Sequence, residues 1–393
     1  MSQFEPAVSH TPVDINDEKW SQLVSLTGGA ASLCYQCGVC TAVCPWTRLR
    51  GQTTSIRQMM RRAQLGLPDD DEELWLCTTC GQCEAYCPRG VDITQVIRGL
   101  RYLMWQERQT PAGLPSILWS LYWNNNPWTQ PPSSRTQWAK DLDLPIFDPE
   151  EHEILLYVGC TVSYDRRSQK IARAVVRLFE AAGVSFGYLG QDEPCCGEAA
   201  LSLGHQPYFS ELAGQAMDVF RERGISHLVT VSPHCFDSFK HHYPIDHSND
   251  GGFQIQHYSQ YLNQLIDDGR LKFDESIEKR LTIHDPCILA RRNSETDGLR
   301  NLLNSIPGIE VVEMEHHGVD TICCGGGGGR MFLETETKER FSDLRLGEAL
   351  ESQAEIMVTA CPYCITCLED SVKIARVNLD VLDLAEIAVI ALA

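Results

Sequence analysis

The residues best suited to chemistry in this sequence are its cysteines, which number 18 among 393 residues. Eight of them form two runs with the same spacing, Cys-x2-Cys-x2-Cys-x3-Cys-Pro. This spacing is typical of chains that bind two 4Fe–4S clusters, because three close thiolates wrap three corners of one cluster and the fourth reaches the other. We therefore expect one cluster on Cys34, Cys37, Cys40 and Cys87, and a second on Cys77, Cys80, Cys83 and Cys44.

The cysteine pattern is that of the two-cluster bacterial ferredoxins, and the shared ligands place the two clusters close together, as an electron relay requires. Two structural zinc sites are the alternative, but zinc usually takes two separated Cys-x2-Cys pairs. The arginines between the two runs have three open interpretations. They could raise a cluster's reduction potential, form a docking face for an acidic partner, or simply lie on a solvated helix surface. They are Arg48, Arg50, Arg57, Arg61 and Arg62.

A second cysteine pattern occurs twice in the C-terminal half. Each copy has a single cysteine after an apolar run, then an adjacent pair, then an ending of the form Cys-Pro-x-Cys. The later copy is complete, with Cys287, Cys323, Cys324, Cys361 and Cys364. The earlier copy has Cys160, Cys195, Cys196 and Cys235, with Ser232 in the place of Cys361. Five thiolates exceed what one cubane needs, so the complete set predicts a non-cubane cluster, or a cubane with a spare redox thiol.

Other polar residues near these patterns are weaker candidates. His234, His257 and His284 could donate a proton to a thiolate or a hydrogen bond to a cluster, although each could equally be a structural histidine. Cys367 has no cysteine counterpart in the earlier copy, and we expect a buried thiol there. The glycines at 325–329 lack a phosphate-binding continuation, so we expect a backbone bent around a cluster with N–H groups directed at its sulfurs.

The elements that must position these cysteines follow an alternating pattern. Apolar runs predict strands, and the periodicity of 168–182 predicts a helix that ends at Gly183. The alternation indicates an α/β architecture with mainly parallel strands. The predicted strands are 154–158, 227–231, 281–284, 309–313 and 354–360.

The C-terminal half is an internal duplication, because three cysteine landmarks recur at offsets of 127, 128 and 129 residues. Overall we expect an α+β protein, with a mostly helical two-cluster domain followed by a duplicated α/β cysteine-rich domain. The expected boundaries are 1–28 for an N-terminal tail with a short helix near Trp20, 29–110 for the two-cluster domain, 111–150 for an extended linker rich in proline and asparagine, and 151–265 and 266–393 for the two cysteine-rich units.

Composition narrows the possible partners. The net charge of −20 argues against a surface for nucleic acid or anionic lipid. No apolar run reaches 18 residues, and the N-terminus has no basic start or apolar core, so we expect a cytoplasmic chain. Association with a membrane would then occur peripherally, through a partner subunit.

The two Cys-Cys-Gly segments, Cys195-Cys196-Gly197 and Cys323-Cys324-Gly325, resemble the cysteine-rich domain of heterodisulfide reductase. The whole chain resembles the ferredoxin-like subunit of that enzyme fused to its cysteine-rich subunit, an arrangement found in the membrane-linked form. Related chains occur with glycolate oxidase, in membrane complexes of sulfate reducers and with class II benzoyl-CoA reductase. The resemblance implies a non-cubane four-iron cluster on the complete set, whose five cysteines would be the catalytic ones. In the earlier copy Ser232 implies an altered cluster, a smaller one or none, since serine is a harder ligand than thiolate.

These observations predict an iron–sulfur subunit of a multi-subunit, anaerobic-type oxidoreductase. Electrons would pass from two cubanes to a non-cubane cluster, where a disulfide or thiol reacts or a further subunit receives them. One alternative is a non-catalytic conduit between a flavin or quinone partner and another catalytic subunit, for example in an aromatic acyl-CoA reductase complex. A second alternative is a zinc-stabilised scaffold. The expected partners are a flavoprotein and a membrane-anchored subunit.

Overall fold

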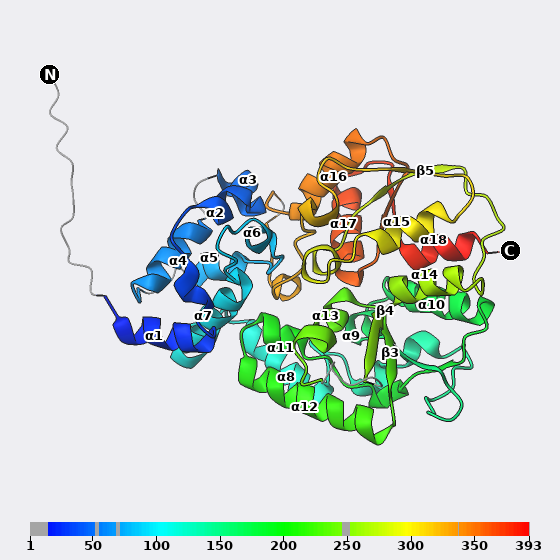
Figure 1. Cartoon of the computed structure of the whole chain (residues 1–393), viewed down its shortest axis with the longest axis horizontal. Coiled ribbons are helices and arrows are strands. Elements are labelled where there is room, and N and C mark those ends of the chain that lie inside the picture. Colours follow the sequence, from blue (N-terminus) through cyan, green and yellow to red (C-terminus); the bar gives the residue numbers. More distant parts are fainter. Residues whose placement is uncertain (1–14, 52–54, 68–70, 246–251, 337, 393) are drawn as a thin grey trace.

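The structure is a computed structural model that describes residues 15–51, 55–67, 71–245, 252–336 and 338–392. A helical N-terminal domain lies at one end of the long axis, beside two α/β units (Figure 1). The short helix expected near Trp20 is confirmed as α1 and begins at an Asn16 cap. The helices of this domain are α1 (Asp17–Leu26), α2 (Val39–Val43), α3 (Pro45–Arg50), α4 (Ile56–Gln64), α5 (Asp71–Leu76), α6 (Gln82–Ala85) and α7 (Ile93–Glu107).

Helices α4 and α7 supply much of the core of the N-terminal domain. Helix α4 buries Ile56, Met59, Met60 and Ala63 at helical spacing, against the buried face of α7. Arg61 lies on the exposed side of α4, so the solvated-face interpretation fits this arginine.

Each α/β unit contains one four-stranded parallel sheet, and the two sheets have equivalent strand orders. The first has the order β2-β1-β3-β4 and the second β6-β5-β7-β8, so β1 to β4 correspond in turn to β5 to β8. This correspondence supports the duplication inferred from the cysteines. The strands are β1 (Ile154–Tyr157), β2 (Phe186–Gly187), β3 (His227–Thr230), β4 (Gln254–His257), β5 (Lys279–Ile283), β6 (Ile309–Val312), β7 (Ile356–Thr359) and β8 (Asp380–Asp383).

All five strands expected from the sequence are present, and β2, β4 and β8 are additional. The helix expected over 168–182 is α10, which runs from Gln169 to Ala181. The other helices of the two units are α9 (Cys160–Tyr164), α11 (Glu198–Ser202), α12 (Gln206–Glu222), α13 (Pro233–His241), α14 (Tyr258–Asp267), α15 (Asp297–Asn304), α16 (Phe341–Glu351), α17 (Pro362–Ala375) and α18 (Leu384–Ile390).

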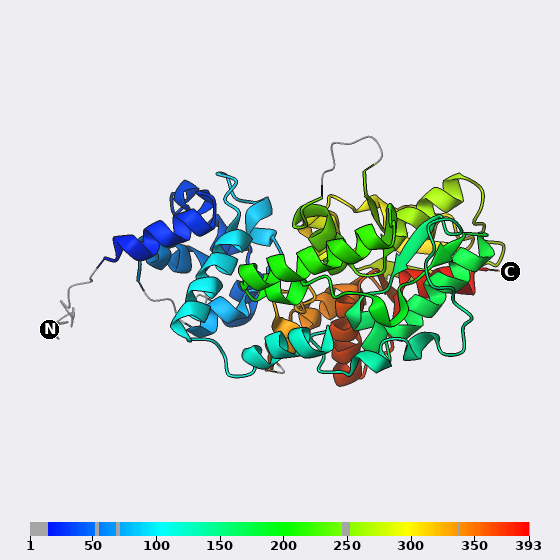
Figure 2. The ribbon, with the colours of Figure 1, turned by 90° about the horizontal axis from the view of Figure 1, so that it is seen from below.

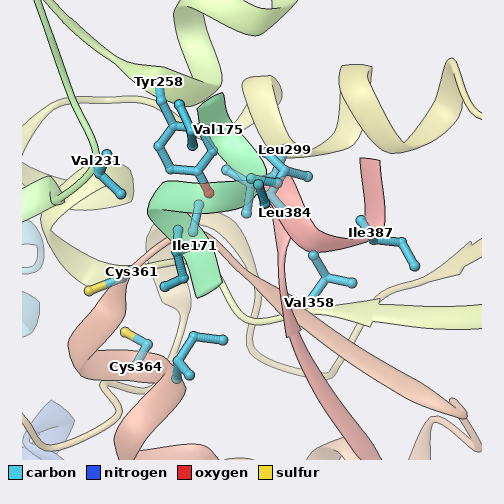
Figure 3. Packing of buried hydrophobic residues seen from close by; sticks show 14 of the residues in the cluster. Ile171, Val175, Val231, Tyr258, Leu299, Val358, Cys361, Cys364, Leu384 and Ile387 are labelled. Atoms are coloured by element: carbon cyan, nitrogen blue, oxygen red, sulfur yellow. The ribbon is translucent and has the colours of Figure 1, made fainter. Parts of the chain in front are cut away.

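The two units share one hydrophobic core. Helix α10 of the first unit packs against α18 of the second, and α14 packs against α15. Figure 3 shows Ile171 and Val175 of α10 among Leu299 and Ile387 of the second unit, with the cysteines that open α17 at the margin of this cluster. The Arg167 guanidinium also donates to both carboxylate oxygens of Glu386 across the boundary, at 2.9 and 2.7 Å.

The sequence suggested an extended connector between the N-terminal domain and the first unit, but the connector is partly helical. It contains the helix α8 (Leu114–Asn124), which buries Leu114 and Leu121 and leaves Trp119 and Trp123 exposed. The proline and asparagine content of this segment predicted a loop. The spacing of its apolar residues within 114–124 instead fits a helix. Among the described residues, no helix is long and apolar enough to cross a membrane.

The N-terminal domain is fastened to both units by one buried side chain. The Arg101 guanidinium donates to the backbone oxygens of Leu74 and Cys77 in its own domain, and to those of Ser202 and Gly328 in the two units, at 2.6–3.0 Å. Figure 2, turned by 90°, shows the N-terminal domain again at one end of the long axis, next to the two units.

Candidate iron–sulfur sites

The eight N-terminal cysteines line two separate cavities. One cavity is lined by the thiols of Cys34, Cys37, Cys40 and Cys87, and the other by those of Cys44, Cys77, Cys80 and Cys83. In each case the cysteine before a proline joins the three cysteines of the other run, which is the grouping expected from the sequence. Four converging thiols around a small cavity fit a 4Fe–4S cluster.

Local backbone features create these two cavities. Gly81 follows Cys80 in the left-handed region, with φ of +75°, and lets the chain turn into α6 with Cys83 on the same side. Backbone N–H groups of Thr79 and Val91 donate to the sulfurs of Cys77 and Cys87, both at 3.4 Å. The first cavity lies nearer the surface, because Cys37 is exposed whereas Cys80 is buried.

Among the described inter-run arginines, Arg57 lines the cavity formed around Cys34 and Cys37. Arg50 forms ion pairs with Glu72 and Glu339. Charge tuning of a cluster by Arg57 therefore stays a prediction.

In both α/β units the cysteines follow the carboxyl ends of the two central strands. Cys160 and Cys287 follow β1 and β5, and the Pro-containing segments follow β3 and β7. Because central parallel strands end at the same edge of a sheet, these segments converge there. In each unit the adjacent cysteine pair lies on a loop that meets them.

All five cysteines of the second set are buried together. The Cys287 and Cys323 sulfurs are 3.8 Å apart, and those of Cys324 and Cys364 are 3.3 Å apart. Burial alone would raise the pKa of the Cys361 thiol, but hydrogen bonds from Cys364 and His234 lower it to about 6. A donor set made entirely of soft sulfur fits an iron–sulfur cluster.

The glycine segment after Cys324 has two roles. The Gly325 N–H donates to the Cys323 sulfur at 3.3 Å, which matches the expected backbone contact. A Cβ at Gly327 would lie 2.5 Å from the Thr78 carbonyl oxygen, so this glycine allows the N-terminal domain to approach. Cys367 was expected to be a buried thiol, yet it is only half-buried and interacts with the Cys324 sulfur.

His284 is placed to hydrogen-bond the second set. The Arg345 Nε donates to the His284 Nδ1 at 3.2 Å, which assigns the ring proton to Nε2. Burial and the Arg345 charge lower the pKa of His284, and its side chain interacts with the Cys324 thiol. The neutral ring can therefore donate one hydrogen bond toward this sulfur.

His234 belongs to the first unit but reaches the second. Its Nδ1 lies 3.4 Å from a Glu198 oxygen, and its side chain interacts with the Cys361 thiol. Although burial alone would lower the pKa of His234, Glu198 and Cys361 raise it well above its ordinary value. Its ring also packs on Tyr363, the equivalent residue of the second unit, with centroids 4.6 Å apart.

His257 has a structural role. It caps α14 through a capping box with Gln260, and burial lowers its pKa to about 3. Because the neutral ring lies at a helix terminus with Ser259 bonded to Nδ1, nothing among the described residues assigns it a redox role.

The cysteines of the first unit are also buried together. The Cys160 thiol interacts with Cys195, and Cys196 interacts with Cys235. Ser232 is the N-cap residue of α13, as Cys361 is of α17, and its hydroxyl contacts Cys235. Ser232 therefore occupies the place of the missing fifth thiol.

The cysteine sets of the N-terminal domain and the second unit are neighbours. The Cys80 and Cys323 thiols perturb each other's pKa, and the Arg291 guanidinium donates to the carbonyl oxygens of Cys80 and Thr321 across the junction. Arg291 and Tyr363 also line the junctions between cysteine sets, and sequence reasoning missed both. Tyr363 could have been found by aligning Ser232-Pro-His-Cys with Cys361-Pro-Tyr-Cys, whereas no local pattern marks Arg291.

Comparison with known families accounts for the three parts of the chain. Residues 30–91 match the 4Fe-4S dicluster domain, and residues 154–240 and 281–369 each match the Cysteine-rich domain. These matches confirm the expected α+β organisation with a duplicated cysteine-rich domain.

Several relatives match most of this chain. A probable membrane-anchored ferredoxin of Chromohalobacter salexigens is 33% identical over 90% of this chain and 58% of its own length. The EtfAB:quinone oxidoreductase of Syntrophomonas wolfei is 34% identical over 80% of this chain, which spans only 46% of that relative. One subunit of the dihydromethanophenazine:CoB–CoM heterodisulfide reductase of Methanosarcina mazei is 28% identical over 89% of this chain and 92% of its own length.

Among solved structures, a hypothetical protein from Helicobacter pylori has a similar fold. The TM-score is 0.51 at 12% identity, and the match covers 96% of this chain and 73% of the other. At this identity the likeness concerns the fold alone.

Proposed function

We propose that this chain, which belongs to the iron–sulfur proteins that combine a 4Fe-4S dicluster domain with two cysteine-rich domains, is an electron carrier. It would carry electrons from the dicluster domain to the second cysteine-rich unit of a multi-subunit oxidoreductase. There the electrons serve disulfide or thiol redox chemistry or leave for another subunit. Its homology to the heterodisulfide reductase chain of Methanosarcina mazei supports this role.

The bridge that Arg291 makes between the Cys80 and Cys323 loops carries this proposal. Cys34, Cys37, Cys40 and Cys87 would hold one cubane, and Cys44, Cys77, Cys80 and Cys83 the other. The five cysteines of the second unit would hold a non-cubane cluster. The three clusters would act as one-electron carriers. Because the loops that carry Cys80 and Cys323 belong to different sets and are bridged by the Arg291 guanidinium, donor and acceptor would lie next to each other.

The surrounding residues support the same role. The buried His284 and His234 side chains interact with the Cys324 and Cys361 thiols, so both histidines are placed to donate hydrogen bonds to sulfurs of the second set. Hydrogen bonds to ligand sulfurs stabilise the reduced, more negative state. Burial of all five thiols limits the access of water to the set.

Electron entry is proposed at the first cubane, because Cys37 is the exposed cysteine of the N-terminal domain. A flavoprotein is the expected donor or acceptor, and a membrane-anchored partner would bring the chain to a membrane surface. The names of the relatives, a probable membrane-anchored ferredoxin and an EtfAB:quinone oxidoreductase, are consistent with such an assembly.

A non-catalytic conduit is the second candidate, and Ser232 favours it. If both cysteine-rich units must take part in disulfide cleavage, a unit without its fifth thiol weakens that activity but leaves electron transfer through the second unit intact.

Metal and sulfide analysis of anaerobically purified protein tests the proposal. We expect about twelve irons per chain, four for each of two cubanes and four for the second unit. The Cys323→Ser variant should lose the signal of the second unit in electron paramagnetic resonance and keep those of the dicluster domain. As a matched control, Cys195→Ser should leave the second unit's signal unchanged. Fewer than about eight irons, or zinc in a colourless protein, would refute the proposal.

A further inference from the structure

We propose that Arg291 is a positioning residue that holds the Cys80 and Cys323 loops together and places an uncompensated positive charge between them, which raises the reduction potential on both sides of the junction. This inference rests on the proposed electron-transfer function and identifies the residue that controls its central step.

The first observation is a backbone clamp. Arg291 lies in a π-helical turn, Ile288–Arg292, directly after Cys287. Its Nε donates to the Cys80 carbonyl oxygen at 2.7 Å. Its Nη1 donates to the carbonyl oxygens of Val319 and Thr321, at 3.0 and 2.6 Å, in the segment that leads to Cys323. One guanidinium therefore fixes loops from two domains.

The second observation is the charge of this guanidinium. Arg291 interacts electrostatically with the thiols of Cys80, Cys287 and Cys323. Among the described residues it has no carboxylate within salt-bridge distance, whereas its neighbour Arg292 lies 3.8 Å from Glu84. The positive charge of Arg291 is thus directed at sulfur.

The third observation is an unsatisfied donor. The Nη2 atom of Arg291 is buried and has no hydrogen-bond partner within the described ranges. A buried charged donor without an acceptor is costly, so an acceptor is expected beside it. The sulfur atoms of a bound cluster would provide one, which agrees with the assignment of the surrounding cysteines as ligands.

The physical consequence follows from electrostatics in a buried site. Adding an electron makes a cluster more negative, and a fixed positive charge nearby stabilises that state more than the oxidised one. Because the guanidinium stays charged at all ordinary pH values, its effect does not depend on titration.

Redox titration of the anaerobic holoprotein, followed by electron paramagnetic resonance, tests the inference. In Arg291→Gln we expect the reduction equilibria of both the Cys80 set and the Cys323 set to shift at least tenfold toward the oxidised form, about 59 mV for one electron. Arg291→Lys keeps the charge but loses the forked geometry, so its shift should be smaller. The control, Arg173→Gln, removes an exposed arginine paired with Asp141 and should leave every potential unchanged.

A second variant covers the case in which Arg291→Gln does not retain iron. Val319 is 51% exposed and its carbonyl accepts from Arg291, so Val319→Glu adds a carboxylate near the guanidinium without removing the clamp. Like Arg291→Gln, it should lower the reduction potentials of the Cys80 and Cys323 sets. Wild-type iron content with unchanged potentials in these variants would overturn the role of Arg291 alone, whereas absence of the clusters from the wild type would overturn the proposed function.

Discussion

Replacing Glu193 with glutamine should loosen the first cysteine-rich unit around Cys160. The Glu193 carboxylate accepts from the Arg135 guanidinium at 2.8 Å and from the backbone N–H groups of Val158 and Gly159, both at 2.9 Å. Only 2% of the Arg135 side chain and 3% of the Glu193 side chain are exposed. The connector thereby fixes the backbone between β1 and Cys160.

The magnitude follows from what the substitution leaves behind. Glutamine is close in size and retains one oxygen for the backbone, but it removes the negative charge and leaves Arg135 buried without a counter-charge. Breaking a buried ion pair in this way costs about 3–5 kcal/mol, which corresponds to roughly a 10²- to 10⁴-fold change in a local opening equilibrium. The cost measures the stranded charge and not the worth of the intact pair.

Amide hydrogen exchange is the suitable assay, because a multidomain protein seldom unfolds in one step. Exchange at the amides of β1 should accelerate by about two orders of magnitude or more in Glu193→Gln. The double variant Arg135→Gln/Glu193→Gln should recover part of the loss, since no unpaired charge remains. As a control, Asp141→Asn breaks an exposed pair and should leave β1 unchanged. Wild-type exchange of β1 in Glu193→Gln would refute the reasoning.

Two further predictions concern the second unit and the missing thiol. Burial raises the pKa of Asp383 to about 8, so between about pH 4 and 8 the folded protein retains a proton that the unfolded chain has lost, and stability falls as pH rises. Asp383→Asn, which retains an N-cap side chain, should flatten this dependence when urea midpoints are compared from pH 5 to 8; parallel profiles for the two proteins would contradict it. In Ser232→Cys, a fifth thiol beside Cys235 should add a second non-cubane signal in electron paramagnetic resonance, whereas a wild-type protein that already shows two such signals would remove the main support for the conduit.

Local sequence patterns predicted the elements that are long or strongly apolar. Strand β1 is buried at all four positions, and a continuous apolar run marks it clearly. Strand β2 has two residues, and β4 has the sequence Gln-Ile-Gln-His, so neither carries an apolar pattern of useful length. These strands form because pairing with β1 and β3 supplies hydrogen-bond partners that the sequence does not show.

The candidate sites divide along the same line. The grouping of Cys44 with the other run could be predicted, because the spacing before Pro45 determines which cavity the thiol reaches. The proximity of the Cys80 and Cys323 loops could not, because it depends on how two domains dock. The connector was misjudged for a related reason: Asn125 and Arg135 occupy a segment of loop-like composition, yet they bond to the chain around Cys195 and Glu193.

The docking of the domains also explains which cysteine-rich unit should have kept its full cysteine set. The dicluster domain packs against the glycine segment of the second unit, where Gly327 admits the Thr78 backbone, and Arg291 ties the Cys80 loop to that same unit. The first unit contributes His234, which interacts with the Cys361 thiol, and the Ser202 carbonyl oxygen, which accepts from Arg101. A thiol lost next to the dicluster domain would interrupt electron entry, whereas the change to Ser232 lies one step beyond it. The complete set therefore stands where the proposed electrons arrive first, and the departure from the pattern is in the unit that can change without breaking that path.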